Sequence, residues 1–255
     1  MALLSDGTIS TLGDLRDYES AIFELASTEQ IDLSRKLALA KQEIEVELTD
    51  FLLRQSMHQA DGSRGARPDL GRVVVTPALR QWHTYHALAL SYRDAYSTHY
   101  NDRYLGKWKG YERLASEASR KSFDIGIGLV YDPIPKAAPA RLSAVAGSSP
   151  GGTYWVRVAW TGAAGQEGEP SDPVYLTVTE GSALAIEATD APVNATGWNV
   201  YAGITSDSVE LQTATPMPAG TNWVMPPDGI IRGRQAGEGQ PAAYFVTLRR
   251  VLQRG

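Results

Sequence analysis

The stretch YDPIPKAAPA, Tyr131–Ala140, divides a chain of 255 residues into two parts with different sequence patterns. Before it, apolar residues recur at spacings of three and four, which is the period of an amphipathic helix. After it, apolar and polar residues alternate in short runs between turn residues, which is the period of a strand. The prolines of the stretch predict an extended, semi-rigid linker over residues 131–140. The sequence therefore predicts an α+β multidomain protein with an N-terminal helical bundle over residues 1–130 and an all-β sandwich after the linker.

The longest predicted helix spans Ile31–Gln55, with the sequence IDLSRKLALAKQEIEVELTDFLLRQ. Its apolar residues share one face and are Leu33, Leu37, Ala40, Ile44, Leu48 and Phe51. The same helix carries an acidic run, Glu43, Glu45, Glu47 and Asp50. A spacing of two puts alternate residues on different helix faces, so the run favours a solvated or channel-lining surface over a paired acid–base site.

Two later helices are rich in aromatic residues. Thr76 and Pro77 predict the start of the first, as an N-cap followed by proline at the first helical position. The aromatic residues expected to pack between helices or subunits are Trp82, Tyr85, Tyr92, Tyr96, Tyr104, Trp108 and Tyr111. A helix that has both a core stripe and a second aromatic face can bury the second face only against another chain. This surplus predicts that subunits assemble side by side into a ring.

The second part of the chain holds the short alternating runs TYWVRVAW, PVYLTV, ALAIEA, GWNVYAG and NWVMP, separated by turn clusters. Such spacing predicts a β-sandwich over residues 141–231. Its expected core residues are Trp155, Trp160, Trp198 and Val200.

Residues 232–255 follow as a predicted C-terminal arm. Its apolar and basic residues are Tyr244, Phe245, Val246, Leu248, Arg249, Arg250, Val251, Leu252 and Arg254. The run YFVTL has strong β-propensity and is suited to adding a strand to an exposed sheet edge of a partner. The alternative is that the arm packs back on the helical bundle of its own chain.

Composition excludes several kinds of function. The chain has no cysteine, which excludes disulfides, thiolate metal sites and a cysteine nucleophile. The net charge of -5 argues against a protein that coats DNA. The N-terminus lacks the pattern of a secretory signal, and no apolar run approaches the roughly 18 residues of a membrane span.

No catalytic or cofactor motif is present. The histidines are His58, His83, His86 and His99, and the pair three residues apart lacks a third metal ligand at motif spacing. There is no phosphate-binding loop and no GxSxG nucleophile elbow. We therefore expect no enzymatic activity, no metal and no cofactor.

Residues 10–125 resemble the head-to-tail connector, or adaptor, proteins of tailed bacteriophages. The resemblance lies in LRDYESAIFELASTEQIDLSRKLALAKQEIEVEL, in TPALRQWHTYHALALSYRDAY and in DRYLGKWKGYERLASEA, by pattern and order. It implies a neck protein of the virion, made in the host bacterial cytoplasm, that forms a ring, usually twelve-fold, under the portal. It also implies that DNA passes through the ring without sequence-specific binding, and that the C-terminal arm docks on the portal or on a neighbouring subunit.

The sandwich resembles the fibronectin type III or immunoglobulin-like modules of phage structural proteins. The residues that carry this are TYWVRVAWTGAAGQEGEPSDPVYLTV and TGWNVYAGITSDSVELQ. Many connectors lack such a module, which would decorate the ring or meet other neck or tail proteins. A competing interpretation is a tail or adhesin module that binds a surface glycan by stacking Trp155, Trp160 or Trp198 on a sugar ring.

Overall fold

The computed structural model describes residues 2–58, 69–99 and 102–247, which form a mixed α+β protein. The chain separates into two compact units. One unit, here called the helical unit, contains residues 7–130 and 242–255. The other, called the sheet unit, contains residues 1–6 and 131–241. The sheet unit is thus an insertion within the helical unit, together with the first six residues of the chain.

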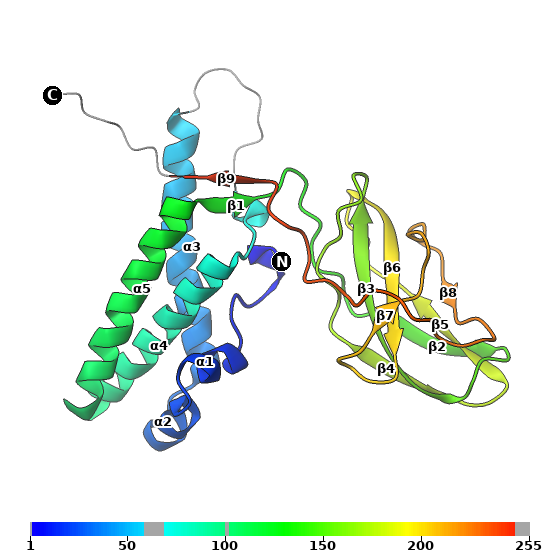
Figure 1. The fold of residues 1–255 in the computed structure, drawn as a ribbon, viewed down its shortest axis with the longest axis horizontal. Helices are drawn as coiled ribbons and strands as arrows, with labels where there is room; N and C mark the ends of the chain where they lie inside the picture. Colours follow the sequence, from blue (N-terminus) through cyan, green and yellow to red (C-terminus); the bar gives the residue numbers. More distant parts are fainter. Residues whose placement is uncertain (1, 59–68, 100–101, 248–255) are drawn as a thin grey trace. The chain divides into compact units, whose positions relative to one another are not determined.

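The helical unit is built mainly of long helices (Figure 1). Its α-helices are α1 (Leu12–Tyr18), α2 (Ile22–Glu29), α3 (Leu33–His58), α4 (Pro77–His99) and α5 (Leu105–Ile125). Thr11 caps α1 in a capping box with Asp14. The Thr76 hydroxyl accepts a hydrogen bond from the Leu79 amide at the start of α4, as the sequence predicts.

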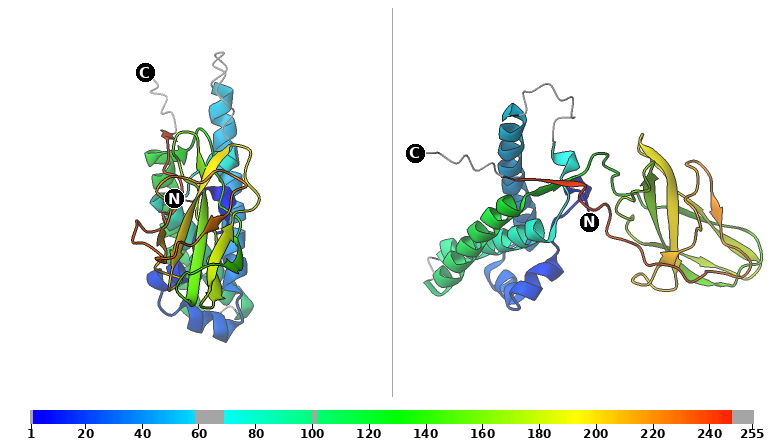
Figure 2. Two further views of the ribbon diagram at one scale, coloured as in Figure 1. Left: turned by 90° about the vertical axis from the view of Figure 1, so that its right-hand side faces the viewer. Right: turned by 45° about the horizontal axis from the view of Figure 1, so that its top comes forward.

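Helix α4 is the centre of the helical unit. Every residue from Ala87 to Tyr92 is buried, so this part of α4 lies largely within the unit. Figures 1 and 2 show α5 lying along α4, and α3 packs on it as well. The predicted apolar stripe of α3 is confirmed, since Leu33, Leu37, Ala40, Ile44, Leu48 and Phe51 are all buried.

A short two-stranded sheet belongs to the helical unit. Strand β1 (Ile127–Leu129) pairs antiparallel with β9 (Tyr244–Val246), with Leu129 opposite Tyr244. The first part of the expected C-terminal arm therefore adds a strand to its own chain rather than to a partner. Strand β1 directly follows α5 and has an unpaired edge, with which the YFV segment of the same chain can pair. Leu248, Arg249, Arg250, Val251, Leu252 and Arg254 lie outside the described residues.

The sheet unit contains two antiparallel sheets. Its strands are β2 (Arg141–Ala146), β3 (Gly152–Gly162), β4 (Val174–Val178), β5 (Ser182–Glu187), β6 (Ala195–Gly203), β7 (Glu210–Leu211) and β8 (Trp223–Val224). One sheet has the order β2-β5-β8 and the other the order β4-β3-β6-β7. Residues of both sheets share one hydrophobic core, which includes Trp160, Trp198 and Val200 as expected.

Trp155 was expected in the same core, but it lies on the other face of β3. The residues of β3 that enter the core are Tyr154, Val156, Val158 and Trp160. Successive side chains of a strand point to opposite faces, so an odd-numbered residue of β3 cannot join them. Trp155 instead packs against a smaller cluster around Tyr201 on the outer face of the four-stranded sheet.

The stretch at residues 131–140 packs into the sheet unit and is not a free linker. Ile134, Ala137 and Ala140 are buried in the core between the sheets. Their spacing of three matches the three residues per turn of a polyproline II helix, which presents one face to the core. The Ala137 amide also donates to the Glu169 carbonyl at 3.1 Å. Proline fixes an extended backbone here, and the apolar residues between the prolines anchor it.

The boundaries of the arm also differ from the expectation. Residues 232–241 belong to the sheet unit, so the arm does not begin at residue 232. Gln240 is buried, and its side-chain amide receives a hydrogen bond from the Ile134 amide and donates one to the Asp132 carbonyl. These bonds bring the two ends of the insertion together, because one side chain satisfies backbone groups of the entering segment.

Candidate functional site

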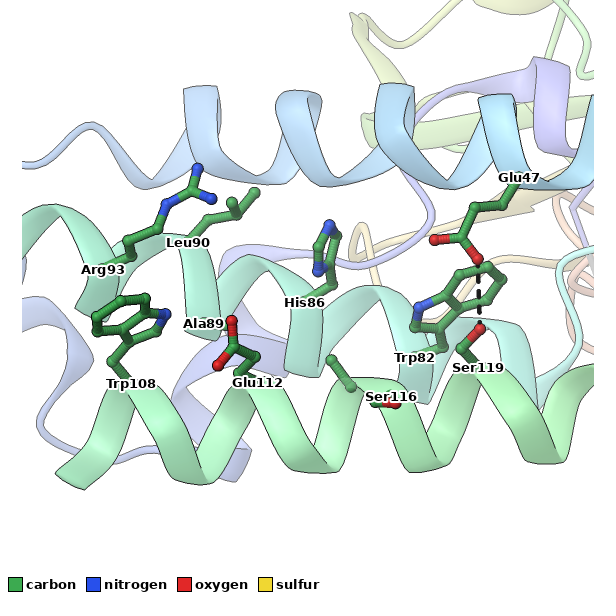
Figure 3. A pocket seen from close by; sticks show the side chains of 11 residues that line it. Glu47, Trp82, His86, Ala89, Leu90, Arg93, Trp108, Glu112, Ser116 and Ser119 are labelled. Atoms are coloured by element: carbon green, nitrogen blue, oxygen red, sulfur yellow. Dashed lines mark hydrogen bonds between the residues drawn. The ribbon is translucent and has the colours of Figure 1, made fainter. Parts of the chain in front are cut away.

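A groove lies between α3 and α5 in the helical unit, with α4 as its floor (Figure 3). We call it the α3–α5 groove; its volume is about 330 Å³. Its lining residues are Glu47, Trp82, His86, Ala89, Leu90, Arg93, Trp108, Glu112, Ala115, Ser116 and Ser119. The floor is mainly apolar and the rims are polar, which is the composition of a surface that binds an amphipathic partner.

The acidic run of α3 contributes two carboxylates to this groove. The Glu47 carboxylate accepts a hydrogen bond from the Ser119 hydroxyl of α5 at 3.4 Å (Figure 3). Glu43 lies one turn away, with a carboxylate oxygen 2.6 Å from Nε2 of His86. Both carboxylates therefore face α4 or α5 at the rim of the groove.

The other two members of the acidic run are placed differently. Glu45 forms an ion pair with Lys41 at 3.7 Å, and Asp50 pairs with Arg54 at 2.7 Å. Both pairs join residues four apart on α3. Pairs of this kind stabilise the helix only slightly. The run is thus divided between two faces of α3, as its spacing predicts.

The histidines at positions 83 and 86 face different partners. His83 is buried, and its Nε2 lies 3.0 Å from the Leu37 carbonyl of α3. Burial lowers the pKa of His83 to about 4, although the bond to Leu37 opposes this. A neutral ring must donate from Nε2, since the carbonyl can only accept. His86 faces Glu43 at the groove, so the two imidazoles do not converge on a common site. The side chains of His58 and His99 lie outside the described residues.

The aromatic residues of α4 and α5 are packed within their own helical unit. Tyr92 stacks on Tyr111 with ring centroids 5.6 Å apart, and Tyr96 packs on Trp108 at 5.4 Å. Trp82, Tyr92, Tyr104 and Tyr111 are buried, and Tyr85, Tyr96 and Trp108 are partly buried against the same cores. The argument that these residues leave a surplus aromatic face for a second subunit is therefore wrong. The aromatic side chains of α4 and α5 pack against each other and against α1.

Glu19 forms a buried polar cluster that holds the turn between α1 and α2 against α5. The Tyr111 hydroxyl donates to the Glu19 carboxylate at 2.9 Å, and Lys107 forms an ion pair with it. Burial alone would raise the pKa of Glu19, but the hydrogen bonds from Lys107 and Tyr111 lower it below its usual value. The Glu19 carboxylate is held by Tyr111 and Lys107, which favours a structural role for it over an acid–base one.

The outer face of the four-stranded sheet carries an aromatic pair, in which Tyr175 is exposed and Trp155 is partly buried. The rings of Trp155 on β3 and Tyr175 on β4 lie 4.8 Å apart, and Tyr175 is 61% exposed. Trp160 and Trp198 are buried, so they have no face free for a ligand. Of the three tryptophans considered for sugar stacking, Trp155 alone lies at the surface of the sheet unit.

Within the described residues, no group of three or more histidine, aspartate or glutamate side chains has the arrangement of a metal site. None of the helices described by the structure is long and apolar enough to cross a membrane. The α3–α5 groove itself has carboxylates at its rim and apolar residues at its floor.

Comparison of the chain with protein-family models and with curated protein sequences finds no match.

Proposed function

We propose that the protein is a structural component of the neck of a tailed bacteriophage. In this proposal the helical unit forms a homo-oligomeric ring that joins the portal to the tail and leaves a channel for DNA. The sequence order that resembles head-to-tail connectors lies within residues 10–125, and all five described α-helices fall in this range. The protein has no catalytic activity in this role, and assembly is its function.

The observation that carries the proposal is an exposed stripe on α3 that holds two apolar residues, Val46 and Leu53, among polar ones. This stripe is defined by Gln42, Glu45, Val46, Thr49, Asp50 and Leu53, and it forms a shallow depression. Val46 is 70% exposed and Leu53 is 56% exposed. Exposed apolar surface costs about 25 cal/mol per Å², so covering the stripe with a second copy stabilises the assembly. The α3 stripe takes the place of the aromatic residues as the contact between subunits.

We assign the sheet unit to the immunoglobulin-like sandwiches at the level of architecture. Seven antiparallel strands in sheets of three and four around one core support this assignment. The order of the strands differs from that of an immunoglobulin constant domain, in which the first two strands pair. Here the first strand of the unit, β2, pairs with β5. The module decorates the ring and meets other neck or tail proteins.

Electrostatics is compatible with a channel for DNA. The chain has a net charge of -5, and phosphate is repelled by a surface of the same sign. Within the acidic run, Glu43 and Glu47 lie at the groove, whereas Glu45 and Asp50 lie on the α3 stripe. A subunit contact at the stripe would cover Glu45 and Asp50, so these two residues would not line the channel in this proposal.

The test is co-purification with a portal protein of the same phage, followed by electron microscopy. We expect a ring bound to one end of the portal. The variant Val46→Lys with Leu53→Lys should remain folded and lose the ring, because two charges would be buried at the contact. Exposed Val193→Lys in the sheet unit is the matched control and should leave the ring intact. Rings that form equally well with lysine at both α3 positions would contradict the assignment of the α3 stripe.

The Trp155–Tyr175 pair favours one second candidate function, the binding of a surface glycan. Aromatic rings with an exposed face can pack against the apolar face of a sugar. Glycan-array binding by the whole protein that disappears in Trp155→Ala would support this function. Binding that is unchanged by Trp155→Ala would remove the pair as the glycan site.

A further inference from the structure

We propose that the free edge of strand β2 pairs with the same edge of a second copy of the chain, antiparallel and about a two-fold axis. Strand β2, Arg141–Ala146, is the outer strand of its sheet and pairs with β5 on the other side. Three features of β2 support this pairing: the direction of its backbone groups, the lack of protection at its edge and the match of the edge to itself. The pairing does not depend on the proposed neck function.

Three residues of β2 direct their backbone N–H and C=O groups away from β5. Ala144 lies opposite Leu184 of β5, whose carbonyl accepts a hydrogen bond at 2.8 Å from the Met225 amide on the β8 side. Opposite residues of an antiparallel pair either bond to each other or both point away, so Ala144 points to the free edge. The direction alternates along a strand, so Leu142 and Ala146 point there as well. Within the part of the chain that the structure describes, no hydrogen bond reaches these three residues from that side.

The β2 edge lacks the features that usually prevent pairing with another chain. Such features are charged side chains, proline, a β-bulge or a very short strand. Strand β2 keeps one register with β5 over its whole length, so it has no bulge. Its residues 142–146 read LSAVA, without charge or proline, and residues 143–146 are all exposed. The edge is therefore open to the addition of a strand.

The other edges of the described sheet unit are better protected. Strand β4 begins directly after Pro173, which has no N–H to donate. Strands β7 and β8 have two residues each, and Glu210 of β7 also forms a bridge with Gln235. Strand β2 is therefore the edge best suited to pairing.

The backbone of the β2 edge is complementary to itself. A two-fold axis beside Ala144 places this residue opposite Ala144 of the second copy. The same axis places Leu142 of each copy opposite Ala146 of the other. Each of these three pairs can exchange two hydrogen bonds. A shift by two residues would leave two such pairs, so the centred register forms the most bonds.

The side chains suit the same register. Ser143 lies opposite Val145 of the second copy, and only methyl groups meet at the centre. Arg141 lies opposite Gly147, so the two arginines do not face each other. The pairing joins two three-stranded sheets into one continuous sheet.

The contact is small, since it involves one strand of each copy. Stable interfaces bury about 1,200 Å² or more, so we expect a dissociation constant on the order of 0.1 mM or higher. At micromolar concentrations the β2 edges are then mostly separate, and the pairing must be captured covalently to be measured.

The absence of cysteine in the chain allows this capture by engineered disulfides in the full-length protein. All variants also carry Val46→Lys and Leu53→Lys, so the α3 stripe does not contribute to association. One protein carries Ser143→Cys and the other Val145→Cys. In the centred register these positions have Cα atoms about 4.5 Å apart, which a disulfide can span. Two copies of one variant place their cysteines diagonally, about 7–8 Å apart, which is too far.

The two proteins are mixed in equal amounts and oxidised with glutathione disulfide, and the dimers are identified by mass spectrometry. Random collision would give mixed dimers twice as often as either like dimer. We expect mixed dimers in about tenfold excess over that random proportion. The matched control mixes Val193→Cys with Ile204→Cys, two exposed positions of the sheet unit, and should give the random proportion.

Blocking the edge should remove the excess. Ala144→Pro in both proteins removes the outward N–H and leaves the bonds between β2 and β5 in place, as proline does on edge strands. If this variant fails to fold by circular dichroism, Ala144→Lys tests the same contact, because it places two lysines opposite each other. A random proportion in the first mixture would overturn the proposal, and so would an excess that the change at Ala144 leaves intact. Neither result bears on the ring, because the α3 stripe carries lysines throughout.

Discussion

His83 is a buried imidazole with one ring nitrogen bonded to the Leu37 carbonyl. Its other nitrogen, Nδ1, has no hydrogen-bond partner among the described residues. The folded protein lowers the pKa of His83 from 6.5 to about 4, mainly by burial. The unfolded chain therefore binds more protons than the folded one between these values, and stability must fall as the pH falls through this window.

We predict that His83→Leu removes this part of the pH dependence. The shift corresponds to roughly 3 kcal/mol of unfolding free energy, which is gained as the pH rises from about 4 to about 6.5. Urea unfolding followed by far-UV circular dichroism at both ends of the window measures it. Leu88→Ala, a buried change on the same helix, should lower stability at every pH and keep the slope. A His83→Leu protein with the slope of the original would show that other groups cause it.

Trp155 and Trp198 illustrate how the face of the strand on which a residue lies decides its contribution to the stability of the fold. Trp198 is fully buried between the two sheets, and Trp155 lies on an outer face. Trp198→Ala should cost about 3–5 kcal/mol of stability, as other large-to-small core changes do. Trp155→Ala should cost less than about 2 kcal/mol. Denaturation of the sheet unit followed by tryptophan fluorescence compares them, and equal losses would contradict the assignment of the two faces.

At the scale of the element, the periodicity of apolar residues predicts which face of a single helix or strand is buried. The spacing of apolar residues placed the buried face of α3, and the alternation in GWNVYAG placed Trp198 and Val200 in the core. Trp155 does not join Trp160 in the core because the two are five positions apart, and an odd offset reverses the face in a strand. The prolines of residues 131–140 predict a linker, because the residues that Ile134 packs against lie in strands far away in the sequence.

Features that depend on long-range contacts were not predictable from the sequence. The pairing of β9 with β1 joins Tyr244 to Leu129, more than a hundred residues apart. The α3–α5 groove exists only because both helices pack on α4. The mutual packing of Tyr92 and Tyr111 likewise depends on how α4 and α5 meet, and it removed the aromatic face that the sequence seemed to leave exposed.

The insertion of the sheet unit leads to a prediction about a shortened chain. Leu129 faces Tyr244 in the β1–β9 ladder, and the Ala243 amide donates to the Leu129 carbonyl at 2.8 Å. The next pair along would be Val130 and Ala243, which an Asn-Gly turn can join as a two-residue hairpin. Removing residues 1–6 and 131–242 and adding this turn should leave a folded helical unit.

Circular dichroism and thermal unfolding test the shortened chain. We expect a cooperative transition and a helical signal in proportion to α1–α5. The control ends at Val130 and lacks β9, and it should be less stable because the edge of β1 is then unpaired. A shortened chain that aggregates or melts without cooperativity would show that the helical unit needs the insertion in order to fold.

At the scale of the whole molecule, the central claim is that the helical units assemble side by side into a closed ring. The claim rests on the α3 stripe, where Val46 and Leu53 are exposed. In a ring each subunit would bury this stripe against a different surface of its neighbour, and a rotation that closes gives an assembly of one size.

The most direct test is the native mass of the purified full-length protein at micromolar concentrations. The account predicts one dominant species made of several subunits of 27.6 kDa each, with a ring shape by electron microscopy. Lysine at both Val46 and Leu53 should reduce it to the monomer. A protein that stays monomeric, both alone and with the portal, would contradict the account.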